Sequence, residues 1–300
     1  MTSRSLRAGF TLVELLFALV LVGIVGGTIA RLVIAQQRFY ASVEERLAMR
    51  ARLRDGADLL SLALRHAAVQ GMPIALATDT AIEIGTIIGA GTMCGVSGAS
   101  IDLTPDAPMT GRAITSFATP PDTTDDVLVY DRGAPSSAPR WLRARIVDVT
   151  TRPVSAVCAA SPLVSVADVA SGRVTELVTV PTVVAPPGAP VRVIRRARFD
   201  VYRASDGQFY LGYRTCGSGC TGVQPVAGPY GTTASAVTLR YFDVAGTLLS
   251  TPVGPASLAR VVRVDVTLRA TSRGVIDLPG RSRSVARDSV TASIALRNAP

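Results

Sequence analysis

The longest uninterrupted apolar run of the chain lies close to its start. From Phe10 to Ala30 the sequence reads FTLVELLFALVLVGIVGGTIA, which is 21 residues. A helix of that length rises about 31 Å and matches the ~30 Å hydrocarbon core of a bilayer. Arg4 and Arg7 precede the run and Arg31 ends it. This pattern predicts a transmembrane helix over residues 10–30, with the short N-terminal stub cytoplasmic and everything after residue 31 outside.

An amphipathic pattern follows the apolar run and extends over residues 31–72. Apolar residues recur there mostly at spacings of three and four, which is typical of one face of a helix. These positions are Phe39, Val43, Leu47, Leu53, Ala57, Leu60, Leu64 and Ala68. Gly71 and Pro73 form a strong stop signal, so we expect the helix to continue to about Gln70. Its second half should pack on the head, and the single histidine, His66, is interpreted as a packed or solvated helix residue.

Residues 73–300 lose the helical period and become rich in β-branched residues and in Gly, Pro, Ser and Thr. Residues 89–125 and 131–140 read mostly as loop. Alternating segments predict strands at 82–88, 127–130, 142–149, 174–180, 191–202, 209–214, 237–242, 261–268 and 290–296. The segment Ala204–Gly207 between two of these strands is a hairpin signal. The expected fold class is α+β, with one long N-terminal helix packed on a mainly antiparallel sheet.

The composition adds charge and cysteine chemistry to this picture. The net charge is +9, and the positive side chains are all arginine. The four cysteines are Cys94, Cys158, Cys216 and Cys220. Their even number and the tight Cys216–Cys220 loop favour disulfides in an oxidising compartment. A bond between Cys216 and Cys220 would leave Cys94 with Cys158, although four cysteines allow three connectivities. Zinc needs paired ligand spacings that this sequence lacks, so no metal and no cofactor is expected.

Glu14 and the position of the basic stub are unusual for an ordinary membrane anchor. An acid at membrane depth costs a few kcal/mol unless it is paired, which marks it as functional by default. A secretory signal peptide carries its cleavage site after the apolar region, whereas here Gly9 precedes it. The run Gly9-Phe10-Thr11-Leu12-Val13-Glu14-Leu15 resembles the prepilin signature of type IV pilins and type II secretion pseudopilins.

The resemblance implies a specific processing and assembly route. Residues 1–9 would be a leader that a prepilin peptidase removes after Gly9, and Phe10 would become the N-methylated first residue. Glu14 would meet the amino terminus of a neighbouring subunit in the fibre. The implied partners are that peptidase, other major and minor pilins or pseudopilins, an inner-membrane assembly platform and membrane lipid. The head, residues 73–300, would be extracytoplasmic or periplasmic before assembly into a pilus or pseudopilus.

The C-terminal third also resembles one branch of this family. The segments VYRASDGQFYLGYR, VQPVAG, VTLRYFDVAGTLL, LARVVRVDVTLRA and VTASIALRN follow the order found in large minor subunits of the PilW/PulJ kind. The stretch from 181 to 190, rich in Pro, Ala and Val, departs from many relatives. The sequence therefore favours a minor subunit near a fibre tip, without separating a type IV pilus from type II secretion or DNA uptake.

The sequence also contains candidate residues for calcium binding, DNA binding and catalysis. The acidic residues Asp122, Asp125, Asp126 and Asp131 offer oxygen ligands for calcium, but their spacing differs from that of an EF-hand, which favours a solvated turn. Arginines between Arg192 and Arg203 suggest contacts with DNA phosphates, the alternative function of a DNA-binding tip subunit. A membrane-anchored enzyme or sensor is the other alternative. One histidine on a helix makes a catalytic triad improbable, so we expect no enzyme.

Overall fold

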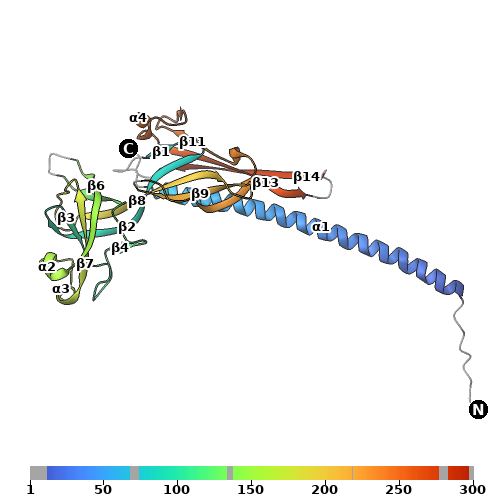
Figure 1. Cartoon of the computed structure of the whole chain (residues 1–300), viewed down its shortest axis with the longest axis horizontal. Helices are drawn as coiled ribbons and strands as arrows, with labels where there is room; N and C mark the ends of the chain where they lie inside the picture. The colour runs from blue at the N-terminus through green and yellow to red at the C-terminus, as the bar shows by residue number, and fades with distance from the viewer. Residues whose placement is uncertain (1–11, 68–73, 134–137, 218, 277–282, 297–300) are drawn as a thin grey trace, which may run out of the picture. The chain divides into compact units, whose positions relative to one another are not determined.

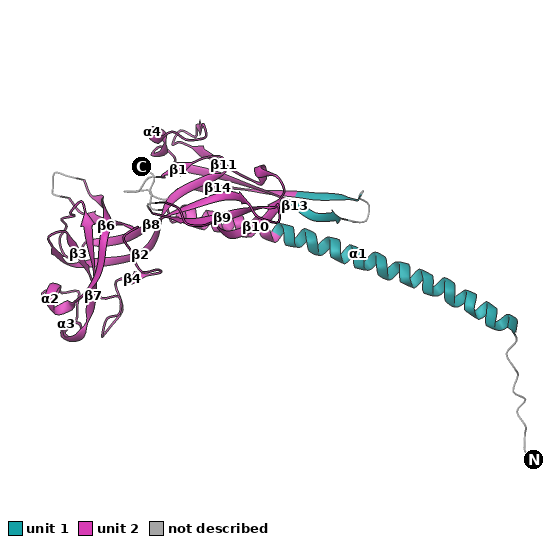
Figure 2. Cartoon of the chain, viewed as in Figure 1, with its two compact units in different colours: residues 1–50, 271–287 teal, residues 51–270, 288–300 magenta. Residues whose placement is uncertain are grey.

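The computed structural model describes residues 12–67, 74–133, 138–217, 219–276 and 283–296 (Figure 1). All the strand pairs with an assigned register are antiparallel, and the chain is α+β with a long N-terminal helix. It divides into two compact units, which are residues 1–50 with 271–287 and residues 51–270 with 288–300 (Figure 2). The division cuts one helix and one pair of strands, so each unit carries part of both.

Helix α1 runs without interruption from Leu12 to Arg65. It is the one helix in the described part of the chain that is long and apolar enough to cross a membrane. Its end differs from the expected one near Gln70. His66 lies in a turn and Ala67 leaves the helix to form an isolated β-bridge with Thr86, so the helix stops at Arg65. Residues 68–73 lie outside the described part.

The larger unit contains a sheet of ten strands in the order β1-β2-β3-β7-β6-β5-β8-β9-β10, with β4 paired to β2. Their bounds are β1 Leu76–Ala77, β2 Ala81–Ser97, β3 Ser100–Leu103, β4 Ser116–Phe117, β5 Asp126–Asp131, β6 Arg140–Pro153, β7 Arg173–Val180, β8 Pro190–Arg203, β9 Phe209–Cys216 and β10 Gln224–Gly231. Because β2 also pairs with β8, the path β2-β3-β7-β6-β5-β8 closes on itself. Six strands therefore form a small antiparallel barrel.

The interior of this barrel is filled by aliphatic side chains from alternate strand positions. They include Met93, Ile101, Leu103, Val127, Val129, Ile146, Leu177, Val191 and Val193. The segment 181–189, which is rich in Pro, Ala and Val, adds Val183, Ala185 and Ala189 to the same core. Three residues of this Pro/Ala/Val loop are therefore buried in the core, while most of its other residues are exposed.

A second sheet has four strands in the order β12-β11-β13-β14. The bounds are β11 Val237–Phe242, β12 Leu248–Leu249, β13 Arg263–Ile276 and β14 Ser284–Ala295. Four short helical segments complete the elements: α2 Val154–Val157, α3 Val166–Ser171, η1 Ala234–Ala236 and α4 Pro255–Leu258. Residues Val264, Val266 and Leu268 are buried, as their alternation with polar residues predicts.

Within the larger unit, the last turns of α1 pack against both sheets. Leu53, Leu60 and Leu64 are buried on one helix face. Gly56 lies on the contact, since a Cβ added there would collide with the Tyr230 hydroxyl and would lie 3.1 Å from Cδ1 of Leu268. Tyr230 belongs to β10 and Leu268 to β13, so one helix residue touches a strand of each sheet. This contact explains a glycine in a helix interior.

The expectation that residues 89–125 are mostly loop is wrong in its first part, because β2 continues to Ser97 and β3 follows at once. The glycines that suggested a loop are strand positions where another segment approaches closely. A Cβ at Gly89 would collide with the Phe117 ring, and one at Gly95 would lie 2.6 Å from the Val157 carbonyl oxygen. Glycine is favoured there because backbone or ring atoms occupy the space of a side chain.

Candidate functional site

The first candidate site is the exposed N-terminal part of α1. Every described residue from Leu12 to Ala41 is solvent-exposed in the isolated chain. The exposed fractions of Leu12, Phe17 and Val22 are 75%, 66% and 69%. An apolar helix surface of this length needs lipid or other apolar helices around it. The surface is therefore suited to an apolar environment such as the core of a membrane.

Glu14 lies in the first turn of α1, within this apolar surface. An acid in the first turn of a helix interacts favourably with the positive end of the helix dipole. In the hydrocarbon layer a carboxylate also gains strongly from a nearby ammonium group, because the low dielectric weakens screening. Gly9 and Phe10, the expected cleavage and methylation residues, lie outside the described residues.

Three glycines of α1, Gly23, Gly26 and Gly27, are not explained by packing inside the chain. Apart from the local helix backbone, a Cβ added at any of them would meet no atom of the described residues within 4 Å. The helix is regular through all three positions. Small residues let membrane helices approach each other closely, so these glycines favour a contact outside this chain.

The four cysteines form two disulfides, Cys94–Cys158 and Cys216–Cys220. This is one of the three connectivities that the sequence allows. Cys94 lies on β2 and Cys158 ends α2, and both are buried in a small cluster with Val154 and Val174. The first bond therefore ties the segment that contains α2 to the barrel, across a sequence separation of 64 residues.

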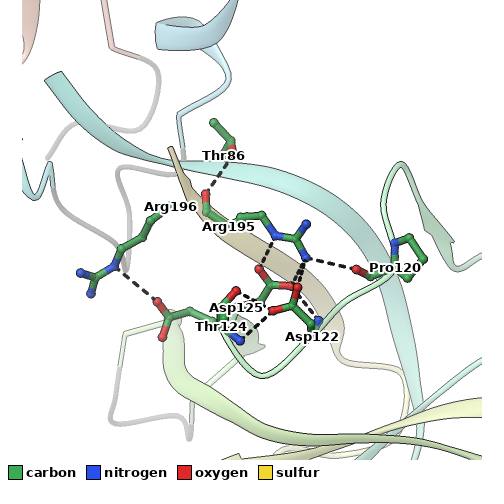
Figure 3. Close-up of polar contacts among 8 residues, drawn as sticks. Thr86, Pro120, Asp122, Thr124, Asp125, Arg195 and Arg196 are labelled. Carbon is green, nitrogen blue, oxygen red and sulfur yellow. Dashed lines mark hydrogen bonds and ion pairs between the residues drawn. The ribbon is translucent and has the colours of Figure 1, made fainter. Parts of the chain in front are cut away.

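The acidic residues that offered a calcium site are instead held by arginine. Arg195 donates from Nε to Oδ1 of Asp125 at 2.7 Å and from Nη2 to Oδ2 of the same residue at 2.7 Å (Figure 3). The same Nη2 lies 2.9 Å from Asp122 Oδ2 and 3.1 Å from the Pro120 carbonyl oxygen. Asp125 is fully buried, so the interpretation of the whole cluster as a solvated turn is wrong for this residue. A guanidinium occupies the place that a cation would need.

The other acids of this cluster also have partners in the barrel. Asp126 Oδ2 accepts from Arg143 Nη2 at 3.0 Å and lies 4.0 Å from Arg196 Nε. Asp131 lies 4.0 Å from Arg140, whose side chain is 72% exposed. Pairs of this exposed kind contribute little to stability, whereas the buried Asp125–Arg195 pair is costly to break.

The arginines that suggested a DNA-binding hairpin lie on β8 and are largely used inside the head. In addition to Arg195 and Arg196, Arg198 donates to Glu83 Oε2 at 2.8 Å. The guanidinium of Arg192 lies 4.4 Å from the centre of the Trp141 ring. A row of arginines committed to such contacts presents little free charge to a phosphate backbone, so the geometry does not favour the DNA-binding interpretation.

Asp102 is a buried acid whose environment the sequence did not reveal. It is fully buried on β3, and neither carboxyl oxygen has a hydrogen-bond partner among the described residues. Burial raises the pKa of Asp102, and the nearby charge of Glu176 raises it further, while Arg152 opposes the shift. Asp102 and Glu176 are direct partners in the β3–β7 register. Asp102 and Glu176 are brought together by the pairing of two strands that are far apart in the sequence.

Comparison with known protein families gives a match over the N-terminal segment. Residues 4–30 match the model of the prokaryotic N-terminal methylation motif. Comparisons with curated proteins and with solved structures give no match. The motif and the exposed apolar helix that continues from it support a type IV prepilin-like protein. They also indicate that it is anchored in a membrane.

Proposed function

We propose that this chain is a minor subunit of a type IV pilus or of a type II secretion pseudopilus, of the PilW/PulJ kind, which acts at or near a fibre tip. The observation that carries the proposal is the N-terminal methylation motif joined to a helix whose apolar surface is exposed on all sides from Leu12 to Ala30. Such a helix requires apolar surroundings, which lipid provides before assembly and neighbouring subunits provide afterwards.

The proposed route begins in the inner membrane with the leader in the cytoplasm and the head in the periplasm. A prepilin peptidase cuts after Gly9 and methylates the new amino group of Phe10. Glu14 then pairs with the terminal amine of a neighbouring subunit, which sets the axial register of the two helices. An assembly platform and other pilins or pseudopilins are the partners, and the head primes or caps the filament.

We also infer that the protein works by assembly and not by catalysis. Its one histidine, His66, is exposed just after α1, and its Nδ1 lies 2.8 Å from the Leu62 carbonyl oxygen. The buried acid Asp125 is neutralised by Arg195, as described above. Among the described residues, neither His66 nor Asp125 is hydrogen-bonded to a candidate nucleophile.

Mass spectrometry of the N-terminus of the membrane-extracted chain tests the processing step. We expect the mature chain to begin at a methylated Phe10, and we expect Gly9→Glu to remain uncut. Gly23→Ala is the matched control, because it changes a glycine that contacts nothing in the chain. A native chain that begins at Met1 would contradict the proposal.

A second experiment separates assembly from processing. Glu14→Leu should still be cut after Gly9 but should fail to enter filaments, which immunoblots of sheared fibres can measure. Glu44→Leu is the matched control, since it removes an exposed acid of the same helix outside the expected span. Normal incorporation of the Glu14→Leu chain would show that this carboxylate does not guide assembly.

A further inference from the structure

The smaller unit brings the ends of two β-strands beside the helix that enters the membrane. It contains residues 1–50 and 271–287 (Figure 2). We call the described residues 271–276 and 283–287 the arginine ribbon. The ribbon is held to the helix by the backbone N–H of Arg273, which donates to Glu45 Oε1 at 2.9 Å. Within the ribbon, the N–H of Ala286 donates to Ser272 Oγ at 3.0 Å, which sets residue 286 opposite residue 272.

One face of the arginine ribbon combines positive charge with exposed apolar side chains. Because strand side chains alternate, that register places Arg273, Val275, Arg283, Val285 and Arg287 on one face. All five are exposed, with exposed fractions of 55% for Val275 and 47% for Val285. The ribbon contains no acidic residue. Exposed valines flanked by arginines form the pattern expected of a surface that meets the interface of an anionic membrane.

An open groove of about 370 Å³ separates the ribbon from α1. The helix contributes Arg38, Ala41, Ser42 and Glu45 to its lining, and the ribbon contributes Gly274, Val275, Ile276 and Arg283. The groove therefore carries two guanidinium groups and a hydroxyl, which are the donors that bind phosphate oxygens. Glu45, the acid in the lining, already accepts the N–H of Arg273.

The position of this groove along α1 coincides with the expected headgroup layer. Beyond Arg31 the helix continues with Leu32, Val33, Ile34 and Ala35, and the exposed fractions of the first three are 60%, 44% and 48%. A tilted helix can immerse this longer stretch, because the long side chain of Arg31 can reach up to the phosphates. Arg38 then lies about 4.5 Å above Ala35, within a headgroup layer roughly 5–8 Å thick, and Ala41, about 9 Å above Ala35, lies at the outer edge of that layer.

We propose that the arginine ribbon and its groove bind the headgroups of anionic phospholipids and dock this part of the chain on the membrane surface that α1 enters. The arginines contact lipid phosphates, and the side chains of Val275 and Val285 insert between the headgroups. The proposal rests on the membrane insertion of α1 but not on the assembly of filaments. The two proposals can therefore fail separately.

Collisional quenching in vesicles tests the docking with the full chain. A fluorophore on Val275→Cys labels one site, because the four native cysteines are in disulfides. The chain is reconstituted in phosphatidylcholine alone or with about one-quarter phosphatidylglycerol. We expect the label to be shielded from aqueous iodide only in the anionic vesicles. Salt at about 1 M should remove the shielding, because it shortens the screening length to about 3 Å. Val244→Cys, which is 84% exposed and lies in the other unit, is the control label.

A charge-neutralised variant makes the test quantitative. Each arginine near an anionic leaflet should raise the ratio of docked to free ribbon about five-fold, so the triple variant Arg273→Gln, Arg283→Gln, Arg287→Gln should lower it roughly a hundred-fold. Arg140→Gln, which changes an exposed arginine outside the ribbon, should leave the ratio unchanged. Circular dichroism and intact disulfides verify that the variants fold.

Three results would overturn the proposal. Equal access of iodide to the label in both vesicle types would show that no docking occurs, and shielding that survives the triple variant would show that arginine does not drive it. Shielding that appears only after other fibre subunits are added would assign the ribbon to a protein contact. N-terminal mass spectrometry of the same samples reports on processing independently, so a failure of docking leaves the assembly proposal intact.

Discussion

The contact between α1 and Tyr230 allows a sharp test of how the helix is held in the head. The change is Gly56→Ala, which adds one methyl group to a helix interior. In an open position that change would stabilise the helix by about 1 kcal/mol. At Gly56 the added Cβ would collide with the Tyr230 hydroxyl and would lie 3.2 Å from Tyr230 Cζ. Overpacking of this kind costs up to about 3 kcal/mol, so after the helix gain of about 1 kcal/mol we expect a net loss of up to about 2 kcal/mol in the free energy of unfolding.

The partner substitution Tyr230→Phe should reverse this loss. The hydroxyl of Tyr230 is buried and has no hydrogen-bond partner among the described residues. Burial raises the pKa of Tyr230, so the hydroxyl stays protonated at neutral pH. An unsatisfied buried hydroxyl costs about 1–3 kcal/mol, so Tyr230→Phe alone should be neutral or stabilising. In the double variant the worst collision is gone, and stability should return to that of the natural chain.

The assay is urea denaturation of the detergent-solubilised chain, followed by the fluorescence of the single tryptophan, Trp141. We expect a coupling energy of about 1.5 kcal/mol between positions 56 and 230, well above the ~0.5 kcal/mol found for independent sites. Gly23→Ala is the control within the same helix, where the added methyl group meets no atom within 4 Å. A stable Gly56→Ala chain, or a coupling below about 0.5 kcal/mol, would refute the packing argument.

Two further predictions concern the polar groups of the barrel. Arg195→Ala should lower the free energy of unfolding by about 3–5 kcal/mol, because it leaves Asp125 buried without its partner, whereas Arg140→Ala should cost under about 1 kcal/mol; equal losses in thermal melts would contradict this ranking. Asp102→Asn should stabilise the head at pH 7. The pKa of Asp102 is raised in the folded state above its ordinary value of 3.8. The natural chain therefore loses stability as the pH rises from 3.8 through the folded-state pKa. The stability advantage of the Asp102→Asn variant should vanish below pH 3.8, where the carboxyl group is protonated in both states. An advantage independent of pH would show that the carboxylate charge is not the cause.

Local patterns in the sequence predicted much of the fold, and long-range pairing explains most of what they missed. The alternation of Val264, Val266 and Leu268 with polar residues predicted β13, because one face of that strand is buried and the other is not. The second half of β2 was missed, since Gly95 in a strand is explained only by the Val157 carbonyl that approaches it from a distant segment. The closure of β2 on β8 left no local signal in the sequence.

The candidate sites divide in the same way. The N-terminal motif consists of residues that are adjacent in sequence, so it can be recognised without knowledge of the fold. The family comparison finds it at residues 4–30. The roles of the polar residues of the head, in contrast, depend on which residues they pair with in the fold. Asp125 suggested a cation ligand and Arg195 suggested a phosphate contact when each was considered alone. Across a sequence separation of 70 residues they form one buried pair, which satisfies both charges and favours neither ligand.

The glycines of α1 differ in whether contacts inside the described chain explain them. Gly56 meets Tyr230 and Leu268, so folding of the head is a sufficient reason for a glycine there. Gly26 lies in the same helix, and a Cβ added there would meet no other segment of the described chain within 4 Å. A glycine in an exposed helix interior costs about 1 kcal/mol relative to alanine, and this chain alone offers no compensating contact at Gly26. In the proposed assembly, a neighbouring helix at close approach or a change in the helix would compensate for this cost. An exposed apolar helix that carries such glycines is thus the physical reason to seek the function of this protein in its assembled state.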